Sequence, residues 1–211
     1  MKAQTPRNPD RTRERLLEAG FREIHRRGFQ PASLDTIVDE AHVTKGALYH
    51  HFPSKQALGY AVVDEVLGAG LHERWLRPLE RAADPLEALI GTVRKASQDK
   101  MVEIGCPVNN LAQEMSAVDA GFQQRICGLY QRWEAGVVRA LERGQTQGRV
   151  RRDVDIGEAA AFIVASLTGA IGLAKTRKDG APLRACAEGL THFLEALRPK
   201  RRSASAGSGK A

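Results

Sequence analysis

The feature that most constrains the fold is a pair of short predicted helices joined by a very tight turn, beginning at Ser33. Ser33 and Thr44 are typical N-cap residues, and each precedes a run whose apolar residues recur at helical spacing. His42 and Val43 lie between the two runs, and Pro53 follows the second. Two short helices separated by so few residues are typical of a helix-turn-helix.

A longer amphipathic helix over residues 10–27 precedes this pair. Leu17, Phe21 and Ile24 recur at i, i+4 and i+7, which places them on one face of the helix. Gly28 follows the basic end of the helix and predicts where it stops. The three helices together predict an N-terminal domain over 10–60 that carries the helix-turn-helix.

The second short helix, 44–52, has an unusual outer face. Ala47, Leu48 and Phe52 are expected to face the core. The other side chains are donors or potential donors of hydrogen bonds, namely Thr44, Lys45, Tyr49, His50 and His51, while Gly46 leaves the backbone open to close approach. A DNA groove is a partner that would bind such a face. The alternative interpretation is a solvated surface with a half-buried Tyr49.

The rest of the chain, 61–197, is predicted to be a helical body. Helical periodicity continues over 85–104, 121–143, 156–175 and 182–197, and Gly105, Cys106 and Pro107 interrupt it before a further helix. No segment of the sequence has the pattern of a strand. The predicted fold class is therefore all-α, with a C-terminal helical domain for ligand binding and dimerisation. Residues 1–9 and 198–211 are predicted to be disordered because they are polar and rich in Pro, Ser or Gly.

Charge alone does not establish DNA binding. The formal net charge is +7, but the five basic residues of the tail 196–211 account for five of those charges. The rest of the chain therefore carries a formal net charge of only +2. This small charge argues against a sequence-nonspecific DNA-compacting protein, which would need a broad basic surface. We expect the basic tail to be solvated.

Several other classes of protein are disfavoured. Cys106, Cys127 and Cys186 are too widely spaced for a zinc site or a disulfide framework, which fits a reducing cytoplasm. The uncharged run 159–174 is short for a membrane span, and its small residues favour a closely packed helix. No catalytic, nucleotide-binding or metal-ligand motif is found, so we expect no enzyme, no metal and no cofactor; an enzyme on a helical scaffold is the remote alternative.

Residues 11–60 resemble the N-terminal domain of the TetR family of repressors. The resemblance lies in 13–17, 19–21, 28–29, 33–41 and 44–58, above all in the run VTKGALYHHFPSKQAL. It implies an all-helical homodimer that represses genes until an effector binds the body. One residue departs from the family pattern, because His42 occupies a turn position that is commonly glycine. If that position needs a positive φ, histidine adopts it at some cost.

The resemblance also implies roles for individual residues. Thr44 and Lys45 would contact the major groove or its edge, and Tyr49 and His50 would contact base edges and phosphates. His51 and Lys55 would clamp phosphates, Gly46 would permit close approach, and Ser33 and Thr36 would offer donors to a phosphate. Arg11 and Arg13 are expected to reach the DNA backbone or the minor groove.

The body resembles part of the same family more weakly, in GCPVNNLAQEMS (105–116) and FIVASLTGAIGLAK (162–175). Some members of that subgroup respond to electrophiles or oxidants. The last two helices are expected to pair with those of a second subunit. Their small residues are Ala159, Ala160, Ala165, Ser166, Gly169, Ala170 and Gly172, and their apolar residues are Phe162, Ile163, Leu167, Ile171, Leu190, Phe193 and Leu197.

An effector is expected in a mainly apolar cavity within the body. The expected lining comes from some of Trp75, Met101, Val108, Met115, Phe122, Tyr130, Trp133 and Phe162. Each of these residues taken alone is more often plain core than ligand wall. The sequence leaves the ligand open, whether a drug-like, aromatic, lipid-like or reactive compound.

Cys106 carries two hypotheses. Its place between Gly105 and Pro107 predicts a helix N-cap, where backbone N–H groups favour a thiolate, and Lys175 is a cation that could lie nearby. Under the first hypothesis, oxidation or alkylation of Cys106 releases DNA. Under the second, Cys106 is an inert, small buried side chain. Cys127 and Cys186 lie within predicted helices and are expected to be structural.

Overall fold

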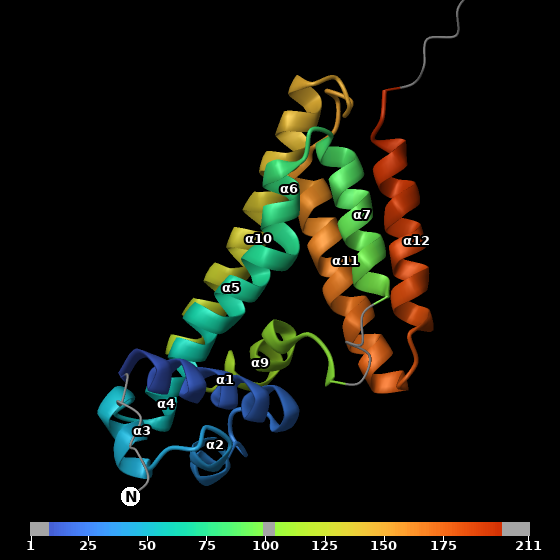
Figure 1. Ribbon diagram of the computed structural model, residues 1–211. Helices are drawn as coiled ribbons and strands as arrows, with labels where there is room; N and C mark the ends of the chain where they lie inside the picture. Colours follow the sequence, from blue (N-terminus) through green and yellow to red (C-terminus); the bar gives the residue numbers. More distant parts are fainter. Residues whose placement is uncertain (1–8, 99–103, 200–211) are drawn as a thin grey trace, which may run out of the picture.

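The helix-turn-helix forms one end of the molecule in the computed structural model, which describes residues 9–98 and 104–199 (Figure 1). Its elements are α1 (Pro9–Arg27), α2 (Leu34–Glu40), α3 (Lys45–His51) and α4 (Lys55–Ala61). Ser33, Thr44 and Ser54 are the N-caps of α2, α3 and α4, and the side-chain oxygen of each accepts a backbone N–H three residues on. The predicted helix pair and its caps are confirmed.

A connecting arm leads from this domain into the body. The arm comprises α4, the π-helical turn η1 (Val62–Leu67), α5 (Gly68–Leu71), a second π-helical turn η2 (His72–Leu76) and α6 (Arg77–Arg81), in one uninterrupted helical path. A π-turn adds a residue to the turn and is frequent at functional sites. The sequence analysis did not predict these two wide turns.

The body consists of α7 (Pro85–Ser97), α9 (Pro107–Met115), α10 (Ala120–Thr146), α11 (Ile156–Arg177) and α12 (Ala181–Ala196). Figure 1 shows α10 beside the arm, α7, α11 and α12 together on the other side, and α9 close to α1. The prediction of one helix over 85–104 is wrong, because α7 ends at Ser97 with Gln98 as its C-cap. Pro107 begins α9 as predicted, after Gly105 at φ +85°.

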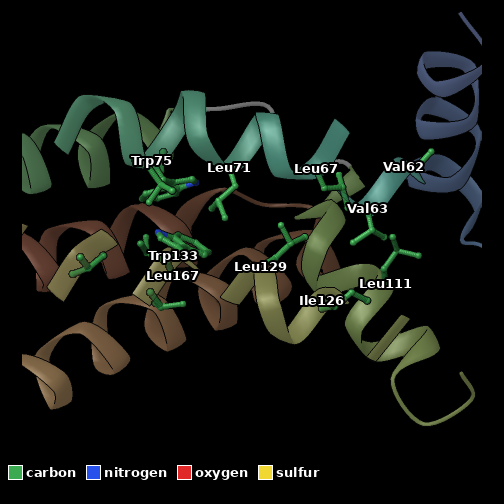
Figure 2. Close-up of a cluster of buried hydrophobic side chains, with 14 of the residues drawn as sticks. Val62, Val63, Leu67, Leu71, Trp75, Leu111, Ile126, Leu129, Trp133 and Leu167 are labelled. Carbon is green, nitrogen blue, oxygen red and sulfur yellow. The ribbon is translucent and has the colours of Figure 1, made fainter. Parts of the chain in front are cut away.

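The buried side chains form one core that runs from the helix-turn-helix into the body. Figure 2 shows the inner face of the arm against α9, α10 and α11, with the rings of Trp75 and Trp133 at a centroid distance of 4.5 Å. At the domain junction, Phe122 meets the rings of Phe29 and Tyr60 at 4.5 and 5.0 Å. The two ends of the molecule therefore share a continuous apolar interior.

By length and composition α11 is apolar enough to cross a membrane. In the fold it packs against α10 and α12, and Ile163, Leu167 and Ile171 are buried there. It is therefore a helix of the body. Its other face is exposed and carries Phe162 and Leu173, which are 50% and 53% exposed.

Candidate DNA-binding surface and effector pocket

The helix α3 is held from beneath by two buried side chains, Leu48 and Phe52. The turn that precedes it is fixed by Arg15 of α1, whose guanidinium donates to the carbonyl oxygens of Ala41 and His42. His42 adopts φ +50°. The turn therefore does need a positive φ at this position, and here a histidine adopts it in place of the usual glycine. These contacts fix the orientation of α3 relative to α1.

The outer surface of α3 carries the predicted donors. Tyr49 is 52% exposed, and Lys45 and His50 are exposed as well. His51 is half-buried, and its ring lies 5.1 Å from that of His50. A Cβ built on Gly46 would meet only the Thr44 hydroxyl, at 3.8 Å, so no packing within the chain requires a glycine there.

Two of the predicted DNA contacts, one to the groove and one to a phosphate, also have partners within the chain. Lys45 Nζ lies 2.5 Å from Asp35 of α2, and the hydrogen bond to this carboxylate raises the pKa of Lys45. Lys55 Nζ donates to the Gln30 carbonyl at 2.8 Å and lies over the Phe29 ring. Ser33 and Thr36 are half-buried at the start of α2, where the Ser33 hydroxyl accepts the Thr36 N–H at 3.4 Å.

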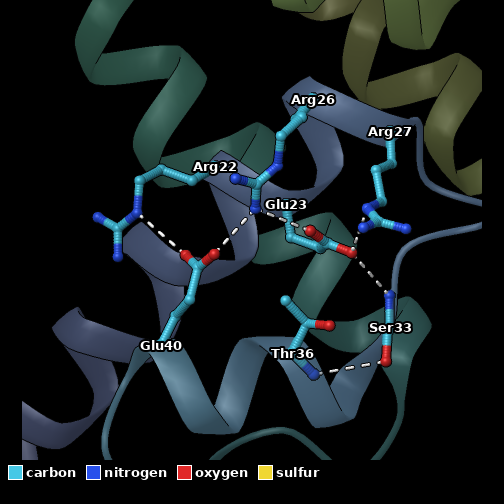
Figure 3. Close-up of polar contacts among 7 residues, drawn as sticks. All are labelled: Arg22, Glu23, Arg26, Arg27, Ser33, Thr36 and Glu40. Carbon is cyan, nitrogen blue, oxygen red and sulfur yellow. Dashed lines mark hydrogen bonds and ion pairs between the residues drawn. The ribbon is translucent and has the colours of Figure 1, made fainter.

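A buried carboxylate that the sequence analysis missed organises this domain (Figure 3). Glu23 has no solvent exposure, and its oxygens lie 3.0 Å from Arg26 and 3.4 Å from Arg27, and accept the Ser33 N–H at 3.3 Å. Glu23 therefore ties α1 to the residue that caps α2. A sequence signal existed, because Glu23 follows Leu16 by seven residues and Ala19 by four, which places it on the buried face of α1, where a glutamate needs partners.

Arg13 does not reach toward DNA as predicted. Its guanidinium is bidentate on Glu65 of η1, at 2.5 and 2.6 Å, and lies over the Phe52 ring. The partner lies 52 residues away in the sequence, so no local pattern could reveal it. Arg13 links the helix-turn-helix to the arm instead.

Helix α9 joins the helix-turn-helix to the body through two polar contacts. Glu114 accepts the backbone N–H groups of Phe29 and Gln30 at 2.8 and 2.7 Å. His25 Nε2 donates to the Gly105 carbonyl at 2.9 Å, just before α9 begins. Burial lowers the pKa of His25 more than this carbonyl raises it, and the charge of Lys175 lowers it further.

This junction predicts a pH dependence. Below about pH 6.5, the ordinary pKa of histidine, the unfolded chain binds a proton at His25 that the folded chain does not. The contribution of His25 to the free energy of unfolding is therefore fully present above that pH. It is lost as the pH falls toward the lowered pKa that His25 has in the folded chain. We expect His25→Gln to flatten the decline in the urea midpoint between about pH 7.5 and pH 5.5. His192→Gln, at an exposed histidine, should keep the wild-type slope; equal slopes in all three proteins would contradict the assignment.

A cavity of about 910 Å³ lies between the connecting arm and α7. Val66 to Pro78 of the arm form one wall, and one face of α7 forms the other. Phe21 of α1 and the start of α9 close one end. Trp75 and Cys106, both named from the sequence, lie in this lining; the charged residues Glu73, Arg74, Arg77 and Lys95, which also line it, were missed.

The other residues expected in the effector site lie elsewhere. Met115, Phe122 and Trp133 are buried in the core, while Val108 and Tyr130 are half-buried. The prediction that Phe162 lines an interior cavity is wrong, because its side chain is half exposed on α11. Its ring packs edge-on against that of Phe193, with 4.9 Å between the ring centroids. Met101 lies outside the described residues. The indole N–H of Trp133 has no hydrogen-bond partner among the described residues.

Cys106 is the N-cap of α9, as predicted, and its surroundings favour the hypothesis of an inert buried side chain over that of a reactive thiolate. Burial raises the pKa of the thiol, and this outweighs the backbone N–H groups of Asn109 and Val108 and the charge of Arg74, all of which lower it. Lys175 donates to Asn110 Oδ1 at 3.1 Å. Burial, with a smaller effect of Cys106, raises the pKa of Tyr130 to about 12.

The other two cysteines differ from each other. Cys186 is half-buried and its thiol donates to the Ser166 carbonyl at 3.4 Å, whereas Cys127 is exposed on α10. Cys127 therefore has no role in the core, contrary to expectation. Within the described residues no three His, Cys, Asp or Glu side chains cluster in a way that could hold a metal ion.

The sequence matches two family models. Residues 16–62 match "Bacterial regulatory proteins, tetR family", and residues 78–190 match "Tetracyclin repressor-like, C-terminal domain", which spans more than half of the chain. The chain belongs to the TetR family. The predicted family and all-α fold class are thereby confirmed, and the TetR family consists of transcriptional regulators rather than enzymes.

Curated relatives agree with this assignment. The transcriptional repressor DhaR of Mycobacterium sp. strain GP1 is 28% identical over 204 residues, which cover 93% of this chain and 95% of that protein. The transcriptional regulator AcuR of Cereibacter sphaeroides is 28% identical over 173 residues, covering 80% of this chain and 78% of that protein.

Solved structures show the same fold. The reduced form of NemR from E. coli superposes with a TM-score of 0.78 at 23% identity, covering 91% of this chain and all of that one. A TetR-family regulator from Cytophaga hutchinsonii superposes with a TM-score of 0.81 at 21% identity, covering 94% of this chain and all of that one.

Proposed function

We propose that this TetR-family protein is a ligand-responsive repressor that binds a near-palindromic operator as a homodimer. The observation that carries the proposal is the exposed face of α3, where Tyr49, Lys45 and His50 project from a helix that caps and buried side chains hold in place. A small-molecule effector in the cavity beside the arm would release the DNA. Such a regulator would act on chromosomal DNA in the cytoplasm.

The exposed face of α11 and α12 supports a homodimer. Phe162 and Leu173 are about half exposed there, and Ala165 and Gly169 between them allow a second backbone to approach closely. Several residues expected at this interface belong instead to the core of one subunit: Ala159, Ala160, Ile163, Leu167, Ala170, Ile171, Leu190 and Leu197. A two-fold arrangement would place two copies of α3 about 34–36 Å apart, one turn of DNA.

Phe21 supports a link between effector and DNA. It belongs to α1 of the helix-turn-helix and also lines the cavity. Its ring stacks on His25 at 5.4 Å, and His25 is bonded to Gly105. A ligand that displaces Phe21 would therefore act on the DNA-binding domain directly. Because Cys106 is buried with a raised thiol pKa, we favour a noncovalent effector.

The first test of the proposal is Tyr49→Ala. A base-edge contact contributes about 1–3 kcal/mol and occurs twice in a dimer, so we expect operator affinity to fall about thirtyfold or more. The free energy of unfolding should stay within about 0.5 kcal/mol of wild type, because the side chain is exposed. Footprinting upstream of the protein's own gene would identify the operator, and gel-shift titrations would then measure affinity.

Arg152→Ala is the control for this experiment, since it removes an exposed side chain in the loop between α10 and α11. Lys55→Ala is a poorer test, because it also breaks the bond to the Gln30 carbonyl. Wild-type affinity of the Tyr49→Ala protein would remove α3 from the interface. Equal affinity for operator and random DNA across a salt titration would favour nonspecific compaction instead.

A further inference from the structure

The cavity beside the arm is kept open by residues that cost helix stability. Gly70 faces it from the arm and Gly91 faces it from α7, and a Cβ built on either would meet no described atom within 4 Å. Glycine in a helix interior destabilises the helix relative to alanine. Ala88 and Ala96 continue the same small wall of α7. A hollow of about 910 Å³ is thus left where larger side chains would fit, and that volume suits an organic molecule.

The wall that the arm forms opposite α7 is apolar and aromatic. Trp75 lies in the lining, with Trp133 packed behind it at 4.5 Å. Leu71 and Phe21 extend this surface toward the helix-turn-helix. Figure 2 shows Leu71 and Trp75 following one another along the arm. A flat or extended apolar group can therefore bury its surface against this wall.

Cations flank the apolar wall from both helices. Arg74 and Arg77 come from the arm and Lys95 comes from α7, whereas Glu73 is the one acidic residue in the described lining. Glu73 pairs with Arg77 at 2.8 Å. The charge of Arg74 acts on the Cys106 thiol at the inner end of the cavity, and Lys95 is exposed on the facing helix. The described lining therefore carries a net positive charge beside an apolar surface.

We propose that this pocket binds an amphipathic organic anion, an aryl or alkyl carboxylate. Its apolar body lies against Trp75, and its carboxylate binds to Lys95 of α7 and Arg74 of the arm, which line opposite walls of the cavity. The ligand class follows from the pocket alone, while its role as the effector rests on the proposed function. The same molecule would touch Phe21 and so reach α1.

The test uses the two tryptophans of the chain, Trp75 and Trp133, as reporters. Octanoate and 4-phenylbutyrate are titrated against their uncharged amides, octanamide and 4-phenylbutyramide, with tryptophan fluorescence as the readout. The carboxylates should give saturable changes, and the amides should bind at least about tenfold more weakly, since a charged hydrogen bond contributes about 1.5–3 kcal/mol. Amides that bind as tightly as the acids would overturn the proposal, as would the absence of binding by either.

Two variants locate the site. Lys95→Met should weaken carboxylate binding about tenfold and leave amide binding unchanged. Arg94→Met is the matched control, because it removes the adjacent exposed cation outside this lining. Gly91→Leu should abolish binding of both probes without lowering the melting temperature, since leucine is the better helix former and enters open space. Undiminished binding by Gly91→Leu would place the ligand elsewhere.

The fluorescence titration contains no DNA. A failure of carboxylate binding can therefore be distinguished from a failure of the proposed repression. The Tyr49→Ala protein should bind octanoate with wild-type affinity, even though we expect its operator affinity to fall. Saturable carboxylate binding that leaves the operator complex intact would support the ligand class and contradict the proposed release step.

Discussion

Replacing Gly169 with arginine should convert the protein into a folded monomer. Gly169 lies on the exposed face of α11, and a Cβ built there would meet no described atom of the same subunit within 4 Å. The subunit therefore accommodates the larger side chain, but a partner helix packed against this face does not. The charge would also be buried without a partner in the dimer.

The loss of the dimer should carry through to DNA binding. A monomer contacts one half-site, and separating two linked binding events lowers affinity by about 10²–10⁴-fold. Analytical ultracentrifugation at micromolar concentration would measure the mass, and gel shifts on the operator would measure affinity. Gly128→Arg is the matched control, since Gly128 is a glycine of α10 with open space around it and lies beside the arm residues Asp64 and Leu76 rather than on the exposed face of α11. A dimeric Gly169→Arg protein would place the interface elsewhere.

The second large effect is expected at Glu23. Glu23→Ala should lower the free energy of unfolding by about 2–4 kcal/mol, because it removes hydrogen bonds to charged groups and leaves the Ser33 N–H without its acceptor. Arg26 and Arg27 are more than half exposed, so water solvates them after the change and limits the cost. Operator affinity should fall as well, because α2 loses its tie to α1.

Urea unfolding followed by circular dichroism would measure the change in stability. Glu18→Ala is the control on the same helix, since Glu18 is 70% exposed and lies 4.0 Å from Arg22. Its effect should stay below about 0.5 kcal/mol. If the two substitutions cost the same, the network in Figure 3 does not stabilise the domain as its geometry indicates.

Local chemistry made the helix-turn-helix predictable. Ser33 and Thr44 each bond a backbone N–H three residues on, so both partners of each cap lie within one short stretch of sequence. The end of α1 at Gly28 is equally local, since the φ of +94° at this residue favours glycine. The N-cap position of Cys106 follows in the same way from its neighbours Gly105 and Pro107.

Features that join distant segments could not be predicted. The N-cap position of Cys106 was predicted, but the choice between its two hypotheses was not, because the burial that raises the thiol pKa comes from the tertiary structure. Arg13 was assigned to DNA from the family resemblance, and its partner Glu65 lies 52 residues away, where no local pattern indicates it. Phe122 and Phe162 both lie on helices, yet one has no exposure and the other is half exposed.

The sequence by itself determined the family, the all-helical class and the helix that presents Tyr49, because these depend on local spacing and on a continuous motif. Tertiary structure alone decided where a ligand can bind. The cavity exists because Gly91 of α7 and Gly70 and Trp75 of the arm line its two walls, and its charge depends on Lys95 and Arg74, which line opposite walls. A hollow is a property of two facing surfaces, and neither helix encodes it alone.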